Sequence, residues 1–93
     1  MIKVTEHAKA VLKSMLISLD ADIDEGLRLM PTADNTFLLV VDTLLSGDQV
    51  VEYEGYKVLL VGVEYFNILD QTVLDCHETE NGDVLLLQNF ANS

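Results

Sequence analysis

The first part of the chain carries an apolar stripe at helical spacing. Apolar side chains recur at i, i+3 and i+4, while lysines occupy the opposite face. Thr5 stands where a helix N-cap is expected, and Glu6 would face the positive end of the helix. The pattern predicts an amphipathic helix over residues 6–19, preceded by a short strand over residues 2–4. The stripe consists of Ala8, Val11, Leu12, Met15, Leu16 and Leu19.

After this helix the spacing changes to that of strands. Leucines alternate with other residues over residues 26–30, which predicts a strand. Residues 36–42 are apolar almost throughout, which favours a strand buried on both faces. A short helical turn is expected over residues 64–69, and Asn81-Gly82 is typical of a type I′ hairpin turn. Further strands are predicted at residues 49–54, 56–61, 72–78 and 83–88.

One helix followed by about seven short strands predicts an α+β fold that is mainly β, with small sheets folded on each other beneath the helix. The chain has 93 residues, of which 49% are hydrophobic, so we expect a single domain over residues 1–93. The apolar runs are far shorter than the roughly 20 residues of a membrane helix. The N-terminal residues also lack the apolar core of a signal peptide. We therefore expect a cytoplasmic protein.

The charge of the chain narrows the choice of partners. Sixteen acidic and five basic residues give a net charge of −11, and no lysine or arginine follows Lys57. A nucleic-acid backbone and an anionic membrane both require positive charge on the protein, so neither is expected as a partner. A cationic protein or a metal ion suits this surface better, although acidity also serves solubility. The single cysteine cannot form an internal disulfide, which fits a reducing compartment.

Five segments of the chain occur in the order and spacing of a known family. They are IKVTEHAKAVLKSML (residues 2–16), GLRL (26–29), GDQVVEYEGYKVLLV (47–61), LDQTVLD (69–75) and GDVLLLQN (82–89). Together they resemble the HesB/IscA family, the A-type iron–sulfur cluster carriers and their relatives. The resemblance covers nearly the whole chain. It implies a HesB-like sandwich or pseudo-barrel of short mixed strands with one N-terminal helix.

The chemistry of that family resides in three cysteines that have no counterpart here. One belongs to a glycine-rich loop after the GLRL strand, but residues 30–36 form a shorter loop without cysteine. The other two form a Cys-Gly-Cys after the last strand, where this sequence has only FANS (residues 90–93). Cluster iron is held mostly by thiolates, so the resemblance implies the fold without the iron–sulfur cofactor. We interpret the chain as a non-enzymatic HesB-like domain with an accessory or protein-binding role, and the family favours a homodimer.

The stretch LDCHETENG contains the candidate metal ligands Cys76 and His77. Adjacent side chains on a strand point to opposite faces, so these two cannot hold one ion or act as nucleophile and base. Cys76 is expected to pack as a small hydrophobe. Linkage to a second chain, or a one-thiolate metal site across a dimer, is the alternative. His7 lies in the first helical turn, a position more typical of a surface histidine.

No metal site is therefore predicted, with His7, Cys76 and His77 as the weaker candidates. The alternative function is a metal-ion binding protein that holds iron through carboxylates and histidine, and it rests on the excess of acidic residues. No hydrolase or nucleotide-binding motif occurs, so no catalytic residue and no enzymatic activity are predicted.

A second set of candidates concerns protein contacts. Ile17 lies off the apolar stripe of the helix, and four aromatic residues gather in the middle of the chain. Aromatic side chains fill the layers of small sandwiches, but they are also enriched in interfaces. Both interpretations stay open, and we expect a protein partner or self-association. The interaction candidates are Ile17, Tyr53, Tyr56, Tyr65 and Phe66.

Overall fold

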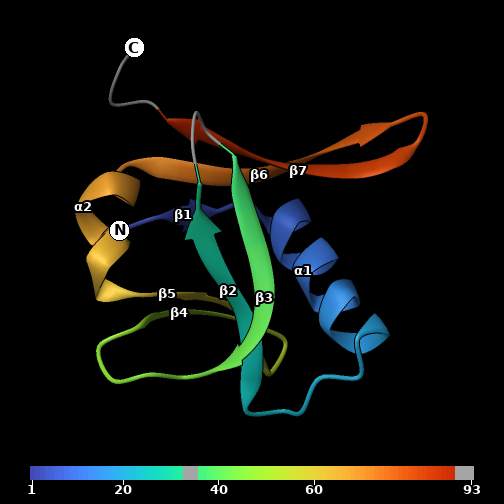
Figure 1. The fold of residues 1–93 in the computed structure, drawn as a ribbon. Coiled ribbons are helices and arrows are strands. Elements are labelled where there is room, and N and C mark those ends of the chain that lie inside the picture. The colour runs from blue at the N-terminus through green and yellow to red at the C-terminus, as the bar shows by residue number, and fades with distance from the viewer. Residues whose placement is uncertain (33–35, 90–93) are drawn as a thin grey trace.

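The computed structural model describes residues 1–32 and 36–89. Its seven strands form two sheets, and the long helix contacts strands of both (Figure 1). The prediction of a mainly β, α+β fold with short mixed strands and one long N-terminal helix is confirmed. The elements are β1 (Lys3–Val4), α1 (Glu6–Ser18), β2 (Glu25–Pro31), β3 (Phe37–Thr43), β4 (Gln49–Tyr53), β5 (Tyr56–Val61), the 3-10 turn η1 (Val63–Tyr65), α2 (Phe66–Leu69), β6 (Thr72–Thr79) and β7 (Gly82–Asn89).

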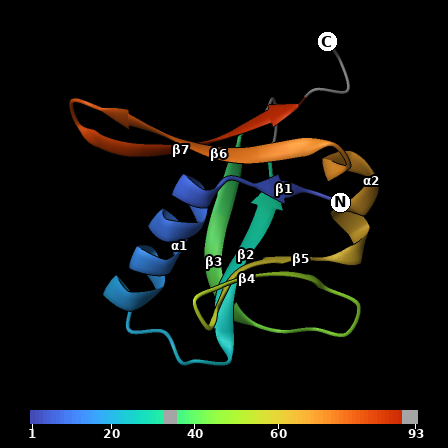
Figure 2. The same ribbon diagram turned by 180° about the vertical axis from the view of Figure 1, so that it is seen from behind.

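Both sheets mix parallel and antiparallel pairs. The three-stranded sheet has the order β1-β6-β7, with β1 parallel to β6 and β6 antiparallel to β7. The four-stranded sheet has the order β3-β2-β5-β4, in which only β2 and β5 are parallel. The β6–β7 hairpin runs crosswise past one end of β2 and β3 (Figure 2). No helix in residues 1–32 or 36–89 is long and apolar enough to cross a membrane.

A capping hydrogen bond marks the start of α1, and a residue with left-handed φ follows its end. The Thr5 hydroxyl accepts a hydrogen bond from the backbone N–H of Ala8 at 3.2 Å, which satisfies one of the free donors of the first turn. After Ser18, Asp20 adopts a left-handed φ of 54°, which ends the helix. The observed bounds agree with the predicted range of residues 6–19 to within one residue.

The core lies between α1 and the two sheets. Most of the predicted apolar stripe faces it, with Ala8, Leu12 and Leu16 fully or almost fully buried, whereas Leu19 at the end of the stripe is 58% exposed. Burial of a leucine side chain contributes about 1.5–3 kcal/mol. The buried residues that form one cluster are Ile2, Ala8, Leu12, Leu16, Leu27, Leu29, Val58, Leu59, Val61, Leu69, Leu74 and Cys76.

The strand β3 differs from the prediction. We expected residues 36–42 to be buried on both faces, but β3 is an edge strand whose outer side chains are exposed. Leu38 is 58% exposed and Val40 is 42% exposed, whereas the alternate residues pack against the core. A continuous apolar run does not distinguish a central strand from an edge strand with an apolar outer face. The prediction of two-sided burial is therefore wrong.

The turn of the β6–β7 hairpin also differs from the prediction. A type I′ turn requires positive φ at both central residues, but at Asn81-Gly82 only Gly82 has it, at 113°. In that hairpin Thr79 pairs with Gly82, so the turn is formed by residues 80–81. The positive pair occurs instead at Glu54 (51°) and Gly55 (86°), which connect β4 to β5.

A buried ion pair fixes the β3–β4 connection onto β2. Arg28 is 9% exposed, and its guanidinium donates two hydrogen bonds to Asp48, at 3.1 and 2.7 Å. Its Nε donates to Asp42 at 2.6 Å, and a further bond at 3.1 Å reaches the Thr43 carbonyl. Asp48 also accepts the backbone N–H of Leu45 at 2.8 Å, and its side chain is 2% exposed. Through these bonds, the Arg28 side chain joins β2, the end of β3 and the turn before β4.

We expect Asp48→Asn to lower the free energy of unfolding by about 3 kcal/mol, because the buried Arg28 would lose the charge of its two-pronged partner. Asp42→Asn is the matched control, since it makes the same change on the same guanidinium at a carboxylate that is 41% exposed. A smaller loss is expected there because solvent screens the pair. Urea unfolding at pH 7 measures the free energy of unfolding of both variants. Equal losses in the two would contradict the larger contribution assigned to Asp48.

The same pair predicts a dependence on pH. The hydrogen bonds from Arg28 hold the pKa of Asp48 below its usual range. Such a carboxyl stabilises the fold above its unfolded-state pKa of about 4, and this stabilisation is lost as the pH falls through the lower folded-state value. Below about pH 4 the wild-type protein should therefore lose stability more steeply than Asp48→Asn. Parallel curves of unfolding free energy against pH would refute this prediction.

Candidate functional site

The two neighbouring candidates on β6 lie on opposite faces of the strand. Cys76 is 4% exposed and belongs to the core cluster. The His77 side chain is 55% exposed, and its Nε2 lies 3.2 Å from a carboxylate oxygen of Asp75. The two side chains thus point to opposite faces of the strand, as the sequence predicted, and they do not converge on one point.

Cys76 instead lies close to a different histidine and to an aspartate. The ligand atoms of His7, Cys76 and Asp83 all lie within 4.8 Å of one another. His7 Nε2 is 3.8 Å from Asp83 Oδ1, and both side chains are 42% exposed. The cluster therefore has a buried thiol at its base and two polar side chains open to solvent. Two of its members were sequence candidates, whereas Asp83 was not.

The β1–β6 pairing brings His7 to this place. Val4 pairs with Leu74 in parallel, and the next backbone N–H, that of Thr5, donates to the Leu74 carbonyl at 3.0 Å. The Thr5 hydroxyl donates to Asp75 at 2.9 Å. The helix therefore starts directly beside β6. Its first turn carries His7, while two residues beyond Leu74 the strand turns Cys76 to the same side.

The register of the β6–β7 hairpin supplies the third member. Cys76 pairs with Leu85, and Glu78 pairs with Asp83. Residues two apart on a strand share a face, so Asp83 is the diagonal neighbour of Cys76 on the face that meets α1. A shift of one residue in this register would turn Asp83 to the other face.

The surroundings of the cluster disfavour a free thiolate. Burial raises the pKa of Cys76, and the negative charges of Asp83, Asp75 and Glu78 raise it further. A reactive cysteine requires the opposite environment, with nearby positive charge that lowers its pKa. Without a cation, Cys76 is thus a neutral thiol and a poor nucleophile.

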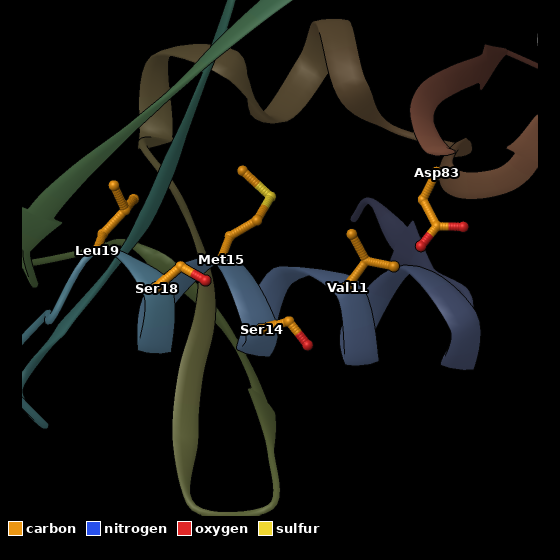
Figure 3. Close-up of a pocket in the computed structure, with 6 residues that line it drawn as sticks. All are labelled: Val11, Ser14, Met15, Ser18, Leu19 and Asp83. Carbon is orange, nitrogen blue, oxygen red and sulfur yellow. The ribbon is translucent and has the colours of Figure 1, made fainter. Parts of the chain in front are cut away.

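A groove of about 340 Å³ extends from Asp83 along one side of α1. Figure 3 shows the Asp83 carboxylate directed from the hairpin toward the helix near Val11, with the other lining residues following along α1. The lining is largely apolar, and Met15 is half-buried. The groove residues are Val11, Ser14, Met15, Ser18, Leu19 and Asp83.

The interaction candidates fall into two groups. Ile17 is 56% exposed on α1. The four aromatic residues Tyr53, Tyr56, Tyr65 and Phe66 are half-buried and pack against the core cluster. Lys13 covers one of them, with Nζ 5.3 Å from the centre of the Tyr56 ring. The packing of these rings accords with the core interpretation, and their participation in an interface stays a prediction.

A more exposed apolar surface lies on β2 and β3, and the sequence interpretation missed it. Leu38 pairs with Met30 of β2, which is 37% exposed, and Val40 lies two residues further along β3. We call Met30, Leu38 and Val40 the β3 surface. The signal that could have revealed it is the apolar run itself, had β3 been recognised as an edge strand.

Comparison with known proteins gives a likeness in structure. No family model and no curated protein sequence matches the chain. Escherichia coli SufA, described as involved in the biosynthesis of iron–sulfur clusters, is similar with a TM-score of 0.66 at 20% identity, over 95% of this chain and 84% of SufA. IscA with a [2Fe–2S] cluster is similar with a TM-score of 0.58 at 14% identity, over 97% and 83% of the two chains.

A protein from Aquifex aeolicus solved by NMR is similar with a TM-score of 0.62 at 24% identity, over 95% of this chain and 90% of that one. All three likenesses extend over nearly the whole of the present chain. The chain therefore has the HesB/IscA-like fold that its sequence segments indicated.

Proposed function

We propose that residues 1–93 form a single, non-enzymatic domain that serves iron–sulfur cluster biogenesis in the cytoplasm through protein contacts, without carrying a cluster. The likeness in fold to SufA and IscA supports the connection with this process. The proposal that the domain carries no cluster rests on the number of thiols in the chain.

An iron–sulfur cluster does not fit the donor groups of this chain. Clusters are held by about four protein ligands, which are mostly cysteine thiolates. The 93 residues contain one cysteine, Cys76, whose sulfur lies near the imidazole of His7 and the carboxylate of Asp83. Even two copies would bring together only two thiolates. Residues 33–35 and 90–93, near which the family's cysteines are expected, lie outside the described residues and contain no cysteine.

The β3 surface supports a role in protein contacts. In the described residues β3 pairs only with β2, so its other edge presents backbone donors and acceptors. Its apolar stretch Phe37–Val41 carries no charged side chain that would oppose the addition of a strand. We expect a strand of another protein molecule, such as a second copy of this chain, to pair along this edge and cover the β3 surface.

We expect anaerobic incubation with ferrous iron and sulfide to leave the protein without a stoichiometric cluster. The chain lacks the thiolates that would hold one. Bound iron, acid-labile sulfide and visible absorption measure the outcome, with Cys76→Ser as the paired sample. A full complement of cluster in the wild-type protein, lost in Cys76→Ser, would disprove the proposal.

We expect Leu38→Lys to weaken self-association, because a charge would replace an apolar side chain at the centre of the β3 surface. The dimer dissociation constant should rise by at least about tenfold, which corresponds to ~1.4 kcal/mol. Sedimentation equilibrium measures it, and a cooperative thermal transition establishes that the variant is folded.

Ile68→Lys is the matched control, since Ile68 is 63% exposed but lies on α2, away from the β3 surface. That variant should associate as the wild-type protein does. Equal effects of the two substitutions, or a wild-type protein that stays monomeric at about 0.1 mM, would count against the role of this surface.

A further inference from the structure

We propose that His7, Cys76 and Asp83 form a binding site for one zinc ion. Three elements supply these ligands, namely the first turn of α1, the middle of β6 and the start of β7, and α1 is far from the other two in the sequence. The inference does not depend on the proposed role in iron–sulfur biogenesis.

The geometry is close to that of a zinc site. Metal–ligand bonds of about 2.0–2.3 Å in a tetrahedral arrangement place the ligand atoms about 3.3–3.8 Å apart. The three ligand atoms here lie within 4.8 Å of one another, and His7 Nε2 and Asp83 Oδ1 are 3.8 Å apart. Binding would draw the ligand atoms closer together, and His7 and Asp83 have room to move because both side chains are 42% exposed.

The donor set selects the type of metal. Thiolate, imidazole and carboxylate are the three protein ligands that zinc accepts. Calcium and magnesium prefer sites made of oxygen atoms, so a set with one sulfur and one nitrogen disfavours both. Three protein ligands leave the fourth tetrahedral position to water, because no other ligand atom of the described residues belongs to the cluster.

The electrostatic surroundings favour a cation. Two carboxylates that are not members of the cluster, Asp75 and Glu78, add their negative charge near Cys76. The positive end of α1 opposes them, but the Thr5 hydroxyl and Asp75 already engage that end. His7 and Asp83 form the solvent side of the cluster, which gives an ion access to the buried thiol.

Binding would also have a structural effect. The hairpin that carries Cys76 and Asp83 contacts α1, but no described hydrogen bond joins Asp83 to the helix. An ion held by His7, Cys76 and Asp83 would link the helix to both strands of the hairpin. Because such an ion binds only the folded chain, it should raise the melting temperature.

The test is titration of the untagged 93-residue chain, with zinc monitored by calorimetry and with cobalt monitored by absorption. We expect one saturable site for zinc and a near-ultraviolet band from thiolate to cobalt. His7→Gln and Asp83→Asn should each weaken zinc binding by at least about tenfold, as for the loss of groups that support a metal site. Cys76→Ser should abolish the cobalt band.

His77→Gln is the matched control, because it removes the neighbouring histidine on the opposite face of β6. It should keep the affinity, the stoichiometry and the cobalt band of the wild-type protein. The two variants at exposed positions, His7→Gln and Asp83→Asn, keep the test decisive if Cys76→Ser fails to fold. The proposal is overturned by weak binding of several ions, by full affinity in both exposed variants, or by an equal loss in His77→Gln.

Discussion

The parallel pairing of β1 with β6 is the contact on which the rest of the arrangement depends. It comprises only two residue pairs, Lys3 with Val73 and Val4 with Leu74, but it joins the start of the chain to a strand about seventy residues later. Thr5 extends it with a backbone bond to β6 and a side-chain bond to Asp75, and the same hydroxyl caps α1. The direction of the helix, and with it the position of His7, is set at this point.

Local patterns were sufficient for most of the elements. The stripe at i, i+3 and i+4 gave α1 nearly to the residue, because an amphipathic helix needs only its own sequence to define its buried face. The alternation on β6 likewise separated Cys76 from His77. The failure at β3 has a physical cause, since whether a strand lies at an edge depends on which strands pair with it. An apolar outer face on Leu38 and Val40 gives the same sequence pattern as burial on both sides.

The candidate site was only partly accessible from the sequence for a related reason. His7 and Cys76 were recognised separately as possible ligands, but nothing local brings together residues 69 positions apart in the sequence. That requires the β1–β6 pairing, which is too short to be recognised as a ladder. Asp83 was not accessible either, because the predicted turn would place Glu80 opposite it. The observed register places Glu78 there and makes Asp83 the diagonal neighbour of Cys76. The turn chemistry pointed to Asn81-Gly82, and the actual turn at residues 80–81 fixes this register.

The burial of Cys76 is compatible with both packing and metal binding, and the two roles differ in what surrounds the sulfur. A cysteine that only fills the core is enclosed within the core, as Leu74 is two residues earlier on the same face, at 0% exposure. Cys76 has the core on one side and an imidazole and a carboxylate on the other. Burial and the nearby carboxylates raise the pKa of the Cys76 thiol, whereas a divalent cation would balance the same negative charges. One thiolate with one imidazole and one carboxylate fits a single ion, and it lacks the sulfur ligands that a cluster requires.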